Sequence, residues 1–442
     1  MRNWTRAALL SLLLLILFYS YGHIYSLLKS VSILGVAIGR HRLLAPVWVL
    51  LAGLAIWVST RKSIDQVAAT PWMNILSALL LVYPFYQIVR YELVVQAAKS
   101  AAAKVTSTGM SSQFQTSPDI YYIILDAYGR TDDLKEVYKY DNSAFIDALT
   151  QRGFYVAGCS QSNYAYTVIS LASSLNMDYL EQYHFTADDQ TSRLILTGAV
   201  RQFLRARGYT IVAFETGYRF TQLEDANVYY TYQPGNNLIN NFEFLFLQTT
   251  LLRAPLDNLK LSEISNTYET KHNLVIHNLE TLKKVPVSVK GPKFVFAHFI
   301  VPHGPYVFGP NWEALTPSQL DDRANLSGFR DSLTFINNAI LPVIDQILAT
   351  SKTPPIIVIQ GDHGGTYWNR PDQRMKILNA YYLPGAENVL YPSISPVNTF
   401  RIIFNAYFGQ NYPLLPDVSR YSPPSPPSQQ YNFHIVPNTC TN

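Results

Sequence analysis

Three long runs without a charged residue dominate the N-terminal part of the chain. They cover 7–28, 43–60 and 67–89. A membrane-spanning helix needs about 20 predominantly apolar residues, and each run is close to that length. The third run also places Trp72, Tyr83 and Tyr86 like the interfacial aromatics of a spanning helix. The pattern predicts a bundle of three transmembrane helices within 1–92, in preference to buried helices of a soluble protein.

The first run has a second interpretation as a cleaved signal peptide, because Arg2 and Arg6 precede it. Its apolar stretch is too long for that, and no small-x-small cleavage site follows closely, so we favour a membrane anchor. Three spans place the two ends of the bundle on opposite sides of the membrane. Lys and Arg residues flank the runs on both sides, so the positive-inside rule does not orient the bundle.

The composition changes after the third run. Residues 93–117 are rich first in Ala and Lys and then in Ser, Thr, Gly and Gln, which indicates a linker. Near the C-terminus, SRYSPPSPPSQQ contains too many prolines for a helix or a central strand. We therefore predict a folded domain at 118–410 and a Pro-rich tail at 411–442 that lies extended over the surface.

Within the folded domain, short apolar runs rich in β-branched and aromatic residues predict buried strands. These runs are 120–125, 210–214, 294–299 and 356–360. Patterns with helical spacing lie between them, at 142–152, 194–207 and 332–349. Strands that alternate with helices predict a layered α/β domain with a mainly parallel sheet.

Composition agrees with a membrane part beside a folded domain, and the charge excludes one class of partner. Charged residues are 14% and hydrophobic residues 48% of the chain, which is too apolar for a wholly soluble protein of this size. The formal net charge is only +4, and no dense basic run is interleaved with aromatics, so we expect no nucleic acid partner. The two cysteines, Cys159 and Cys440, are compatible with one disulfide in an oxidising compartment and equally with free thiols.

Carboxylates follow two of the predicted strands directly. Asp126 comes after 120–125, and Asp362 with His363 comes after 356–360, among glycines that let the backbone approach closely. Ligands of open α/β sheets bind outside the carboxyl ends of the strands. These positions therefore predict a site at one edge of the sheet.

Two histidines and a threonine extend the set. His298 lies in the strand at 294–299, and His303 follows that strand in a Pro/Gly turn. Thr167 opens a predicted helix, where free N–H groups favour a bound phosphate or sulfate. Each residue alone has an ordinary structural explanation as a strand end, an N-cap or a turn residue. Their combination is what indicates chemistry.

Two carboxylates, an imidazole and a hydroxyl make an oxygen-rich site for one divalent cation. We expect Mn²⁺ or Zn²⁺, with Ca²⁺ or Mg²⁺ as alternatives. Such a cation would lower the pKa of the Thr167 hydroxyl and create a nucleophile at neutral pH. His303, together with His298, would bind the non-bridging oxygens of an ester or protonate the leaving alcohol.

The order of these motifs resembles the alkaline phosphatase superfamily. A strand ending at Asp126 is followed by N-Y-x-x-T-x-x-S-L-A-S around Thr167, by P-H-x-P-Y at His303 and by G-D-H-G at 361–364. This order is similar to the sulfatase-like branch, which contains lipoteichoic acid synthases and phosphoethanolamine transferases.

The resemblance implies a layered α/β/α catalytic domain outside the cytoplasm, carried on an N-terminal membrane bundle. It implies that the metal ligands are Asp126, Thr167, Asp362 and His363. It also implies that Thr167 becomes covalently phosphorylated and that His303 binds substrate.

The chain departs from this pattern in three respects. Sulfatases carry C-x-P-x-R or S-x-P-x-R where this chain has Thr167 followed by Val-Ile-Ser-Leu, and threonine cannot form the formylglycine aldehyde. A phosphoester or phosphodiester is therefore the favoured substrate. No second Asp and His pair at D-x-x-x-H spacing accompanies His298 or His303, which favours a single metal. Three spans are also fewer than the five common in the transferases, which weakens the link to a lipid substrate.

The sequence thus predicts a membrane-anchored phosphoester or phosphodiester transferase with a phosphothreonine intermediate. It would move a phospho-head group from a lipid donor to a glycan or lipid acceptor at the cell surface. A hydrolase of phosphate or sulfate esters would use the same residues, and no residue separates the two. A catalytically silent, membrane-tethered binding module is the alternative from another class, and the complete set of presumed ligands argues against it.

Overall fold

The chain forms two compact units. The computed structural model describes residues 4–29, 31–33, 36–60, 70–72, 74–89, 117–181, 188–233, 241–258, 267–309, 311–315, 319, 326–365, 370–423 and 431–440. Unit 1 comprises Met1–Val94 and Pro234–Thr267, and unit 2 comprises Val95–Gln233 and Tyr268–Asn442. Residues 241–258, which fall inside the catalytic range predicted from sequence, therefore belong to the unit of the N-terminal helices.

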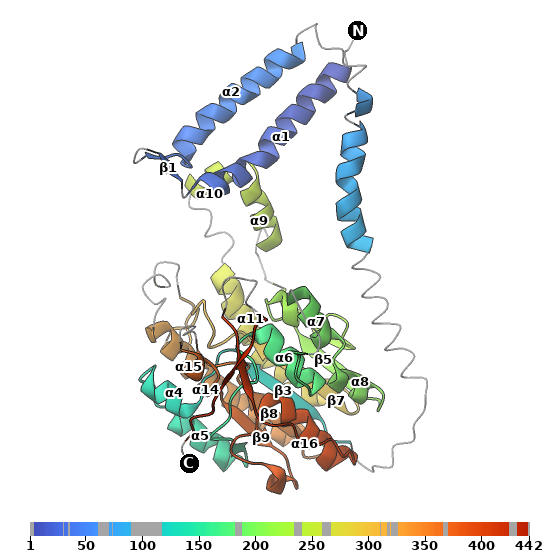
Figure 1. The fold of residues 1–442 in the computed structure, drawn as a ribbon, viewed down its shortest axis with the longest axis vertical. Helices are drawn as coiled ribbons and strands as arrows, with labels where there is room; N and C mark the ends of the chain where they lie inside the picture. Colours follow the sequence, from blue (N-terminus) through green and yellow to red (C-terminus); the bar gives the residue numbers. More distant parts are fainter. Residues whose placement is uncertain are drawn as a thin grey trace. The chain divides into compact units, whose positions relative to one another are not determined.

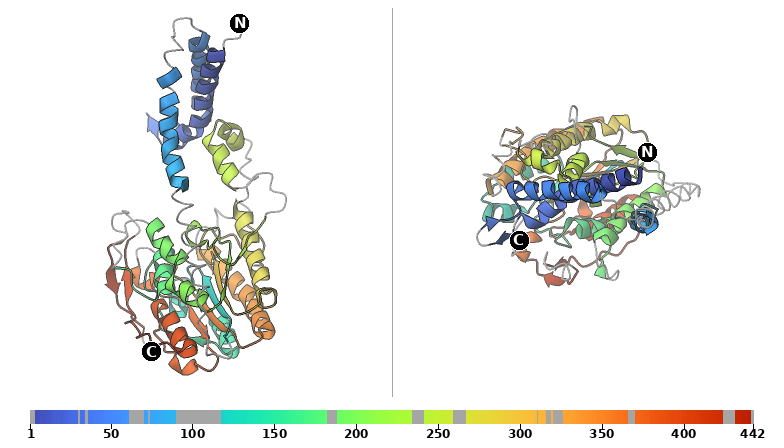
Figure 2. Two further views of the ribbon diagram at one scale, coloured as in Figure 1. Left: turned by 90° about the vertical axis from the view of Figure 1, so that its right-hand side faces the viewer. Right: turned by 90° about the horizontal axis from the view of Figure 1, so that it is seen from above.

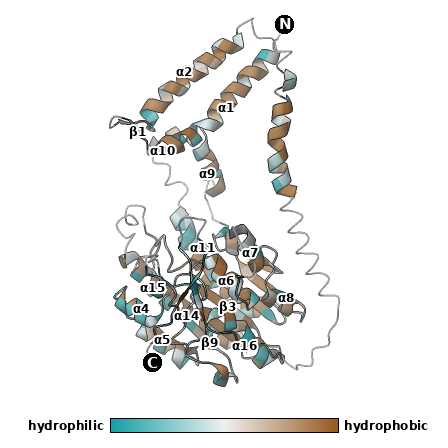
Figure 3. Cartoon of the chain, viewed as in Figure 1, coloured by the Kyte–Doolittle hydropathy of each residue, from teal (hydrophilic) through white to brown (hydrophobic). Residues whose placement is uncertain are grey.

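Unit 1 is built on apolar helices, which Figure 3 draws mainly in brown. Helix α1 (Trp4–Leu28) is joined through the short strands β1 (Ser32–Ile33) and β2 (Val36–Ala37) to α2 (His41–Thr60) (Figure 1). Tyr21, Leu44 and Trp48 form a small buried core between α1 and α2. A third apolar helix covers Thr70–Val89. Two shorter helices, α9 (Asn241–Thr249) and α10 (Arg253–Asn258), complete the unit.

Four helices in the described part of the chain are long and apolar enough to cross a membrane. Three of them are the N-terminal helices, and the fourth, Leu326–Thr350, is α14 of unit 2. Half of the most apolar window of α14 is buried, against 22% or less for the other three, because one side of α14 packs in the core of unit 2. The predicted apolar helices at the N-terminus are confirmed, and the number that cross the membrane stays a prediction.

Unit 2 contains a seven-stranded sheet in the order β4-β9-β8-β3-β7-β5-β6. Its five neighbours β8, β3, β7, β5 and β6 are parallel, and β9 and β4 are antiparallel additions at one edge. The strands are β3 (Ile120–Leu125), β4 (Tyr155–Val156), β5 (Thr210–Phe214), β6 (Val228–Tyr230), β7 (Lys293–Phe299), β8 (Ile356–Gln360) and β9 (Asn379–Tyr382).

Helices cover both faces of the sheet, because its central strands are apolar on both faces. In β3, Tyr121, Ile123 and Leu125 enter one core and the alternate residues enter the other. The first core is completed by α4 (Thr131–Glu136), α5 (Ser143–Gln151), α11 (Thr267–Leu282), α12 (Val285–Ser288) and α14 (Leu326–Thr350). The second is completed by α6 (Thr167–Asn176), α7 (Asp188–Leu196), α8 (Ala199–Arg205) and α16 (Pro396–Phe408). In the left view of Figure 2 the green helices and the yellow and orange helices lie on opposite sides of the strands.

The layered α/β fold with a mainly parallel sheet confirms the predicted fold class. All four predicted strands are present, as β3, β5, β7 and β8. The helix predicted at 194–207 is instead two helices, α7 and α8, which break at Gly198. A Cβ at that glycine would lie 2.9 Å from the carbonyl oxygen of Leu175, so the chain passes too close to α6 for a larger residue.

The ends of unit 2 are tied to its body. Strands β10 (Ser419–Tyr421) and β11 (His434–Val436) pair antiparallel within the predicted tail. Cys159 and Cys440 form a disulfide, which settles the pairing that the sequence left open.

Short helices α15 (Pro371–Arg374), η2 (Arg219–Thr221) and η4 (Glu387–Val389) complete the unit. The predicted linker at 93–117 lies outside the described residues except for Ser117, as do residues 67–69 of the third predicted span and residues 424–430 of the Pro-rich segment.

Candidate active site

The candidate residues meet at the carboxyl ends of β8, β3 and β7, which are neighbours at the centre of the sheet. Asp126 directly follows β3, and Asp362 follows β8. His298 is in register with Ile124 of β3, so it lies on the sheet face that α6 covers. Three strands of one parallel sheet thus bring together side chains that are far apart in sequence.

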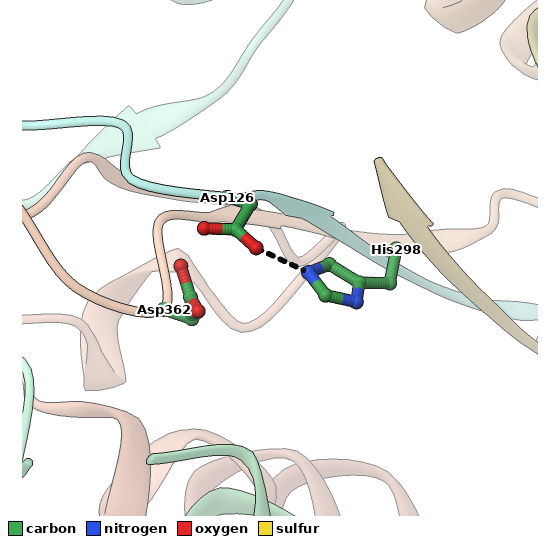
Figure 4. A group of neighbouring side chains, drawn as sticks. All are labelled: Asp126, His298 and Asp362. Carbon is green, nitrogen blue, oxygen red and sulfur yellow. Dashed lines mark ion pairs between the residues drawn. The ribbon is translucent and has the colours of Figure 1, made fainter. Parts of the chain in front are cut away.

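Asp126, His298 and Asp362 form a buried cluster that could hold a metal ion. One ligand atom from each lies within 4.8 Å of the others. Figure 4 shows the Asp126 carboxylate between the other two side chains, with the dashed line marking its ion pair to His298. In that pair Nε2 of His298 lies 3.3 Å from Oδ2 of Asp126.

His363 and Thr167 reach the same place. Nε2 of His363 lies 3.6 Å from Oδ1 of Asp126 and 3.5 Å from Oδ2 of Asp362. The same nitrogen lies 3.2 Å from Oγ1 of Thr167. The four residues expected to act together, Asp126, Thr167, Asp362 and His363, are therefore brought together in the structure.

Each of the two imidazoles makes a hydrogen bond at Nδ1, and Nε2 of each ring lies toward the carboxylates of the cluster. Nδ1 of His363 lies 2.8 Å from its neighbour's carbonyl oxygen, which can only accept, so Nδ1 carries the proton and Nε2 keeps its lone pair. Burial lowers the pKa of His363 to about 4, which keeps its ring neutral near pH 7. Nδ1 of His298 lies 3.0 Å from Oγ1 of Thr221, and Thr221 can donate its own proton to the carbonyl of Tyr218.

Unpaired buried atoms show that the cluster fits a divalent cation. Oδ1 of Asp126, Oδ2 of Asp362 and Nε2 of His298 are buried and have no hydrogen-bond partner among the described residues. Buried polar atoms in native proteins nearly always have a hydrogen-bond partner, so three atoms without one in a single cluster require an explanation. Two carboxylate oxygens and imidazole nitrogens are a donor set that suits Zn²⁺ or Mn²⁺. His298, expected to bind substrate, lies among the possible ligands.

The electrostatics of the cluster keep its first carboxylate ionised. Burial raises the pKa of Asp126, but the imidazoles of His303 and His298 more than offset this and hold the pKa below its ordinary value. Asp362 accepts a 3.0 Å hydrogen bond at Oδ1 from the backbone N–H of Ala127, which leaves its other oxygen directed at the cluster. Ionised carboxylates are the form that binds a metal.

The glycines around Asp362 are required by close backbone approach. A Cβ at Gly361 would lie 2.3 Å from the carbonyl oxygen of Tyr128. A Cβ at Gly364 would lie within 2.6–2.9 Å of three carbonyl oxygens of the 373–376 segment. The loop after β8 is therefore packed directly on neighbouring backbone, which holds Asp362 and His363 in place.

Thr167 is the first residue of α6, a helix buried on nearly every side. One turn further along, Ser170 donates a 2.6 Å hydrogen bond from Oγ to the carbonyl of Asp362. This bond joins the nucleophile's helix to the loop of the metal ligands. The free N–H groups of the first turn and the helix dipole favour a negatively charged group beside Thr167.

His303 borders the cluster. Its backbone N–H donates to the carbonyl of Asp126 over 3.1 Å. Its ring centroid lies 6.1 Å from that of His363. Nδ1 of His303 lies 2.7 Å from the Gly304 carbonyl, which can only accept, so Nδ1 carries a proton. The ring is therefore beside the cluster and outside the closest group of ligand atoms.

Two cations that the sequence analysis missed hold the loops of the site. Arg374 donates from Nη1 to the carbonyls of Gly364 and Gly365 and from Nε to that of Ala165, at 2.7–3.1 Å. Burial lowers its pKa to about 10, so it stays charged at neutral pH. It links the loop of His363 to the loop before α6. No local pattern in its segment distinguishes it from a surface arginine.

Lys271, on α11, holds a second loop of the site, the one that carries His303. Its Nζ donates 2.9 Å hydrogen bonds to the carbonyls of His303 and Pro305. Burial lowers its pKa to about 7, against the opposing effect of Asp126. Lys271 therefore positions the His303 loop, and its place between two polar helix residues gave no signal in the sequence.

No family model matches this sequence, and no curated protein matches it. Solved structures resemble it at low identity. The zinc complex of the C-terminal periplasmic domain of EptC from Escherichia coli is 11% identical, with 67% of this chain and 84% of that chain covered and a TM-score of 0.45. The integral membrane lipooligosaccharide phosphoethanolamine transferase A from Neisseria meningitidis is 12% identical, with 88% and 80% covered and a TM-score of 0.43.

The lipoteichoic acid synthase LtaP from Listeria monocytogenes is 11% identical, with 69% of this chain and 77% of that chain covered and a TM-score of 0.44. These are enzymes of the branch that the motif order resembles. Because the identities and TM-scores are low, the proposals below depend on the side chains of the site.

Proposed function

We propose that this protein is a membrane-anchored, metal-dependent transferase of phosphoesters or phosphodiesters with Thr167 as its nucleophile. The observation that carries the proposal is the set of three unpaired, buried ligand atoms of Asp126, His298 and Asp362 beside the Thr167 hydroxyl. Such atoms cost free energy unless a ligand pairs them. A hydroxyl at a helix N-terminus next to that position suits attack on a phosphoryl group.

In the first half-reaction the oxygen of Thr167 forms a bond to phosphorus and the bond from phosphorus to the leaving alcohol breaks. The proton of the Thr167 hydroxyl ends on the leaving alcohol, and His303 is the residue placed to relay it through its Nε2. The second half-reaction is the reverse with a new hydroxyl, which restores Thr167. A divalent cation held by Asp126, Asp362 and His363, with His298 beside them, would lower the pKa of the Thr167 hydroxyl and neutralise charge on the phosphoryl oxygens.

The N-terminal helices support a membrane location, and the Cys159–Cys440 disulfide supports an oxidising compartment outside the cytoplasm. The donor we propose is a lipid phospho-head group, and the acceptor is a glycan or lipid of the cell surface. With water as acceptor the same two steps make a hydrolase. The test below separates these outcomes.

The experiment uses the purified full-length chain. Its metal content is measured by mass spectrometry before and after chelation, and turnover of a chromogenic phosphodiester is compared between wild type and Thr167→Ala. We expect about one bound divalent ion and a loss of at least about a thousandfold in kcat/KM for the variant. Thr150→Ala, at an exposed helical threonine whose hydroxyl bonds only the Ile146 carbonyl among the described residues, is the matched control and keeps full activity.

A phosphorylated Thr167 trapped with a lipid donor, and its transfer to an added alcohol in preference to water, support the transferase. Release of product to water alone supports the hydrolase. A metal-free protein without turnover would instead make the chain a binding module and would overturn the proposal.

A further inference from the structure

The segment 241–258 is the part of the molecule that the proposed function leaves unexplained. It is inserted between β6 and α11 of unit 2, yet it belongs to unit 1. The backbone N–H of Leu251 donates to the carbonyl of Phe18, in α1, over 2.8 Å. Gly22 allows this close packing, because a Cβ there would collide with the Gln248 carbonyl. The segment 241–258, which lies in sequence between two elements of the catalytic unit, thus packs directly on the first apolar helix.

One face of α9 is apolar and uncovered. Phe242, Leu245 and Phe246 are 76%, 62% and 45% exposed, and they lie on one stripe of the helix at i, i+3 and i+4. Phe244, on the opposite side, is only 8% exposed. A water-soluble helix buries its apolar stripe, whereas α9 buries Phe244 and leaves the apolar stripe of Phe242, Leu245 and Phe246 exposed.

The exposed face of α9 continues a similar stripe on α1. Leu12, Leu15, Ile16 and Tyr19 are all exposed and repeat at helical spacing. The ring of Tyr19 lies 5.8 Å from that of Phe246, and the ring of Phe246 lies 6.5 Å from that of Phe242. The exposed apolar stripe of α1 therefore meets that of α9 where Tyr19 lies beside Phe246.

A basic end borders this apolar surface. Lys29, Arg40 and Arg42 are exposed where α1 ends and α2 begins. The first 60 residues contain no Asp or Glu. Asp257 of α10 contacts this end and is paired with His41 and Arg253 at 3.0 and 3.3 Å. Cations beside an apolar face match the phosphate and acyl layers of an anionic leaflet.

We propose that α9 is an interfacial membrane helix, whose Phe242, Leu245 and Phe246 contact the acyl chains of phospholipids while Lys29, Arg40 and Arg42 face their anionic head groups. Because the segment is inserted between β6 and α11, the leaflet is the one on the side of the catalytic domain. The inference goes beyond the proposed function, since none of these residues belongs to the candidate active site. It gives the catalytic domain a second membrane attachment inside its own sequence.

Site-directed spin labelling of the full-length chain tests this surface. Both native cysteines are in the disulfide, so an introduced cysteine is the free thiol available for a nitroxide. Leu245→Cys and Phe242→Cys report on the proposed lipid face, and Ala144→Cys, at an exposed position of α5, is the water-exposed control. Collision rates with oxygen, which concentrates in lipid, and with a water-soluble nickel chelate are measured in vesicles of phosphatidylglycerol and phosphatidylcholine.

We expect the oxygen-to-nickel collision ratio at 242 and 245 to be several-fold higher than at 144. A ratio equal to that at 144 would place the face in water and overturn the proposal. Exclusion of both reagents would mean that protein covers the face, either the catalytic unit or a second copy, and would overturn it as well.

A second measurement tests the role of the charges without relying on any apolar variant. In vesicles of phosphatidylcholine alone, the ratio at 245 is expected to fall, and Arg40→Gln with Arg42→Gln should cause a similar fall in the mixed vesicles. Ratios that do not depend on lipid charge would contradict the head-group contact. Neither measurement depends on enzymatic activity, so a failed catalytic proposal would not affect the result.

Discussion

Two groups of His and Asp side chains, one in each unit, differ in how their polar atoms are satisfied. In unit 1, His41 is bonded at Nδ1 to the Tyr21 hydroxyl and at Nε2 to Asp257, and Arg253 completes the group. In unit 2, the facing atoms of Asp126, Asp362 and His298 have no hydrogen-bond partner among the described residues.

The difference separates a structural contact from a binding site. Every ring nitrogen of His41 has a partner, so that group joins α10 to α1 and α2 and needs no ligand. The carboxylates of Asp126 and Asp362 lie together in a buried cluster and keep oxygens without a hydrogen-bond partner among the described residues, which is unfavourable without a cation and favourable around one. The same residue types therefore have opposite consequences for stability, and an Asp→Asn substitution distinguishes them.

The largest effect is expected for Asp362→Asn. Loss of one charged ligand should reduce kcat/KM by at least about a thousandfold and should reduce metal retention after dialysis. Without metal, the free energy of unfolding of the variant should be about 1–2 kcal/mol higher than that of wild type, because the substitution relieves repulsion between two buried carboxylates. Denaturant unfolding in the presence of chelator measures the second effect.

Asp372→Asn, at a half-exposed carboxylate 3.7 Å from Arg370, is the control and should change neither quantity. A metal-free Asp362→Asn protein that is less stable than wild type would contradict the interpretation of the unpaired atoms.

A smaller effect, on pH dependence, is expected for Asp133→Asn in α4. Both carboxylate oxygens of Asp133 are buried without a hydrogen-bond partner among the described residues, and burial raises its pKa to about 7. The unfolded chain loses this proton near pH 4 and the folded protein keeps it to about pH 7, so rising pH favours unfolding across that window. Between pH 4 and pH 7 the free energy of unfolding should therefore fall by about 2–4 kcal/mol more in wild type than in the variant.

The measurement is the difference in unfolding free energy between wild type and Asp133→Asn at several pH values from 4 to 8. Because both proteins share their other carboxylates, the difference isolates Asp133. A difference that is constant with pH would show that Asp133 ionises at an ordinary pKa in the folded protein.

The smallest effect is expected for Asp257→Asn in unit 1. Its carboxylate is paired but 28% exposed, so the substitution should destabilise the protein by no more than about 1 kcal/mol. Thermal unfolding in detergent micelles checks this, with Asp345→Asn, in the more exposed pair with Arg152, as the reference for a surface ion pair. Turnover of a soluble phosphodiester should stay unchanged, and a loss comparable to that of Asp362→Asn would remove the distinction between the two groups.

Much of the catalytic unit could be predicted because its signals are local. The strands β3, β5, β7 and β8 are continuous apolar runs, and such runs have few alternatives to a buried parallel sheet. The positions of Asp126 and Asp362 followed from one rule about the carboxyl ends of parallel strands. The roles proposed for these residues stay predictions, which the variants above test.

Other parts could not be predicted because they depend on contacts between distant segments. Arg374 acts on carbonyls of two loops, and nothing in its own segment indicates them. His298 joins the possible ligands because its register with β3 turns it to the face of α6. The apolar pattern of 241–249 resembles that of a core helix, and its contact with α1 appears only when the chain is folded.

Hydrophobic order along the chain was enough to establish apolar N-terminal helices, a layered α/β domain and the edge at which chemistry is concentrated. The pairing of Cys159 with Cys440, the side of the sheet to which His298 points and the return of 241–258 to the first helix arose from packing. Local patterns specify which residues must be buried, because the spacing of apolar residues can be read within one segment. Which buried groups meet depends on strand register and on how the chain crosses between elements, and these involve two or more segments.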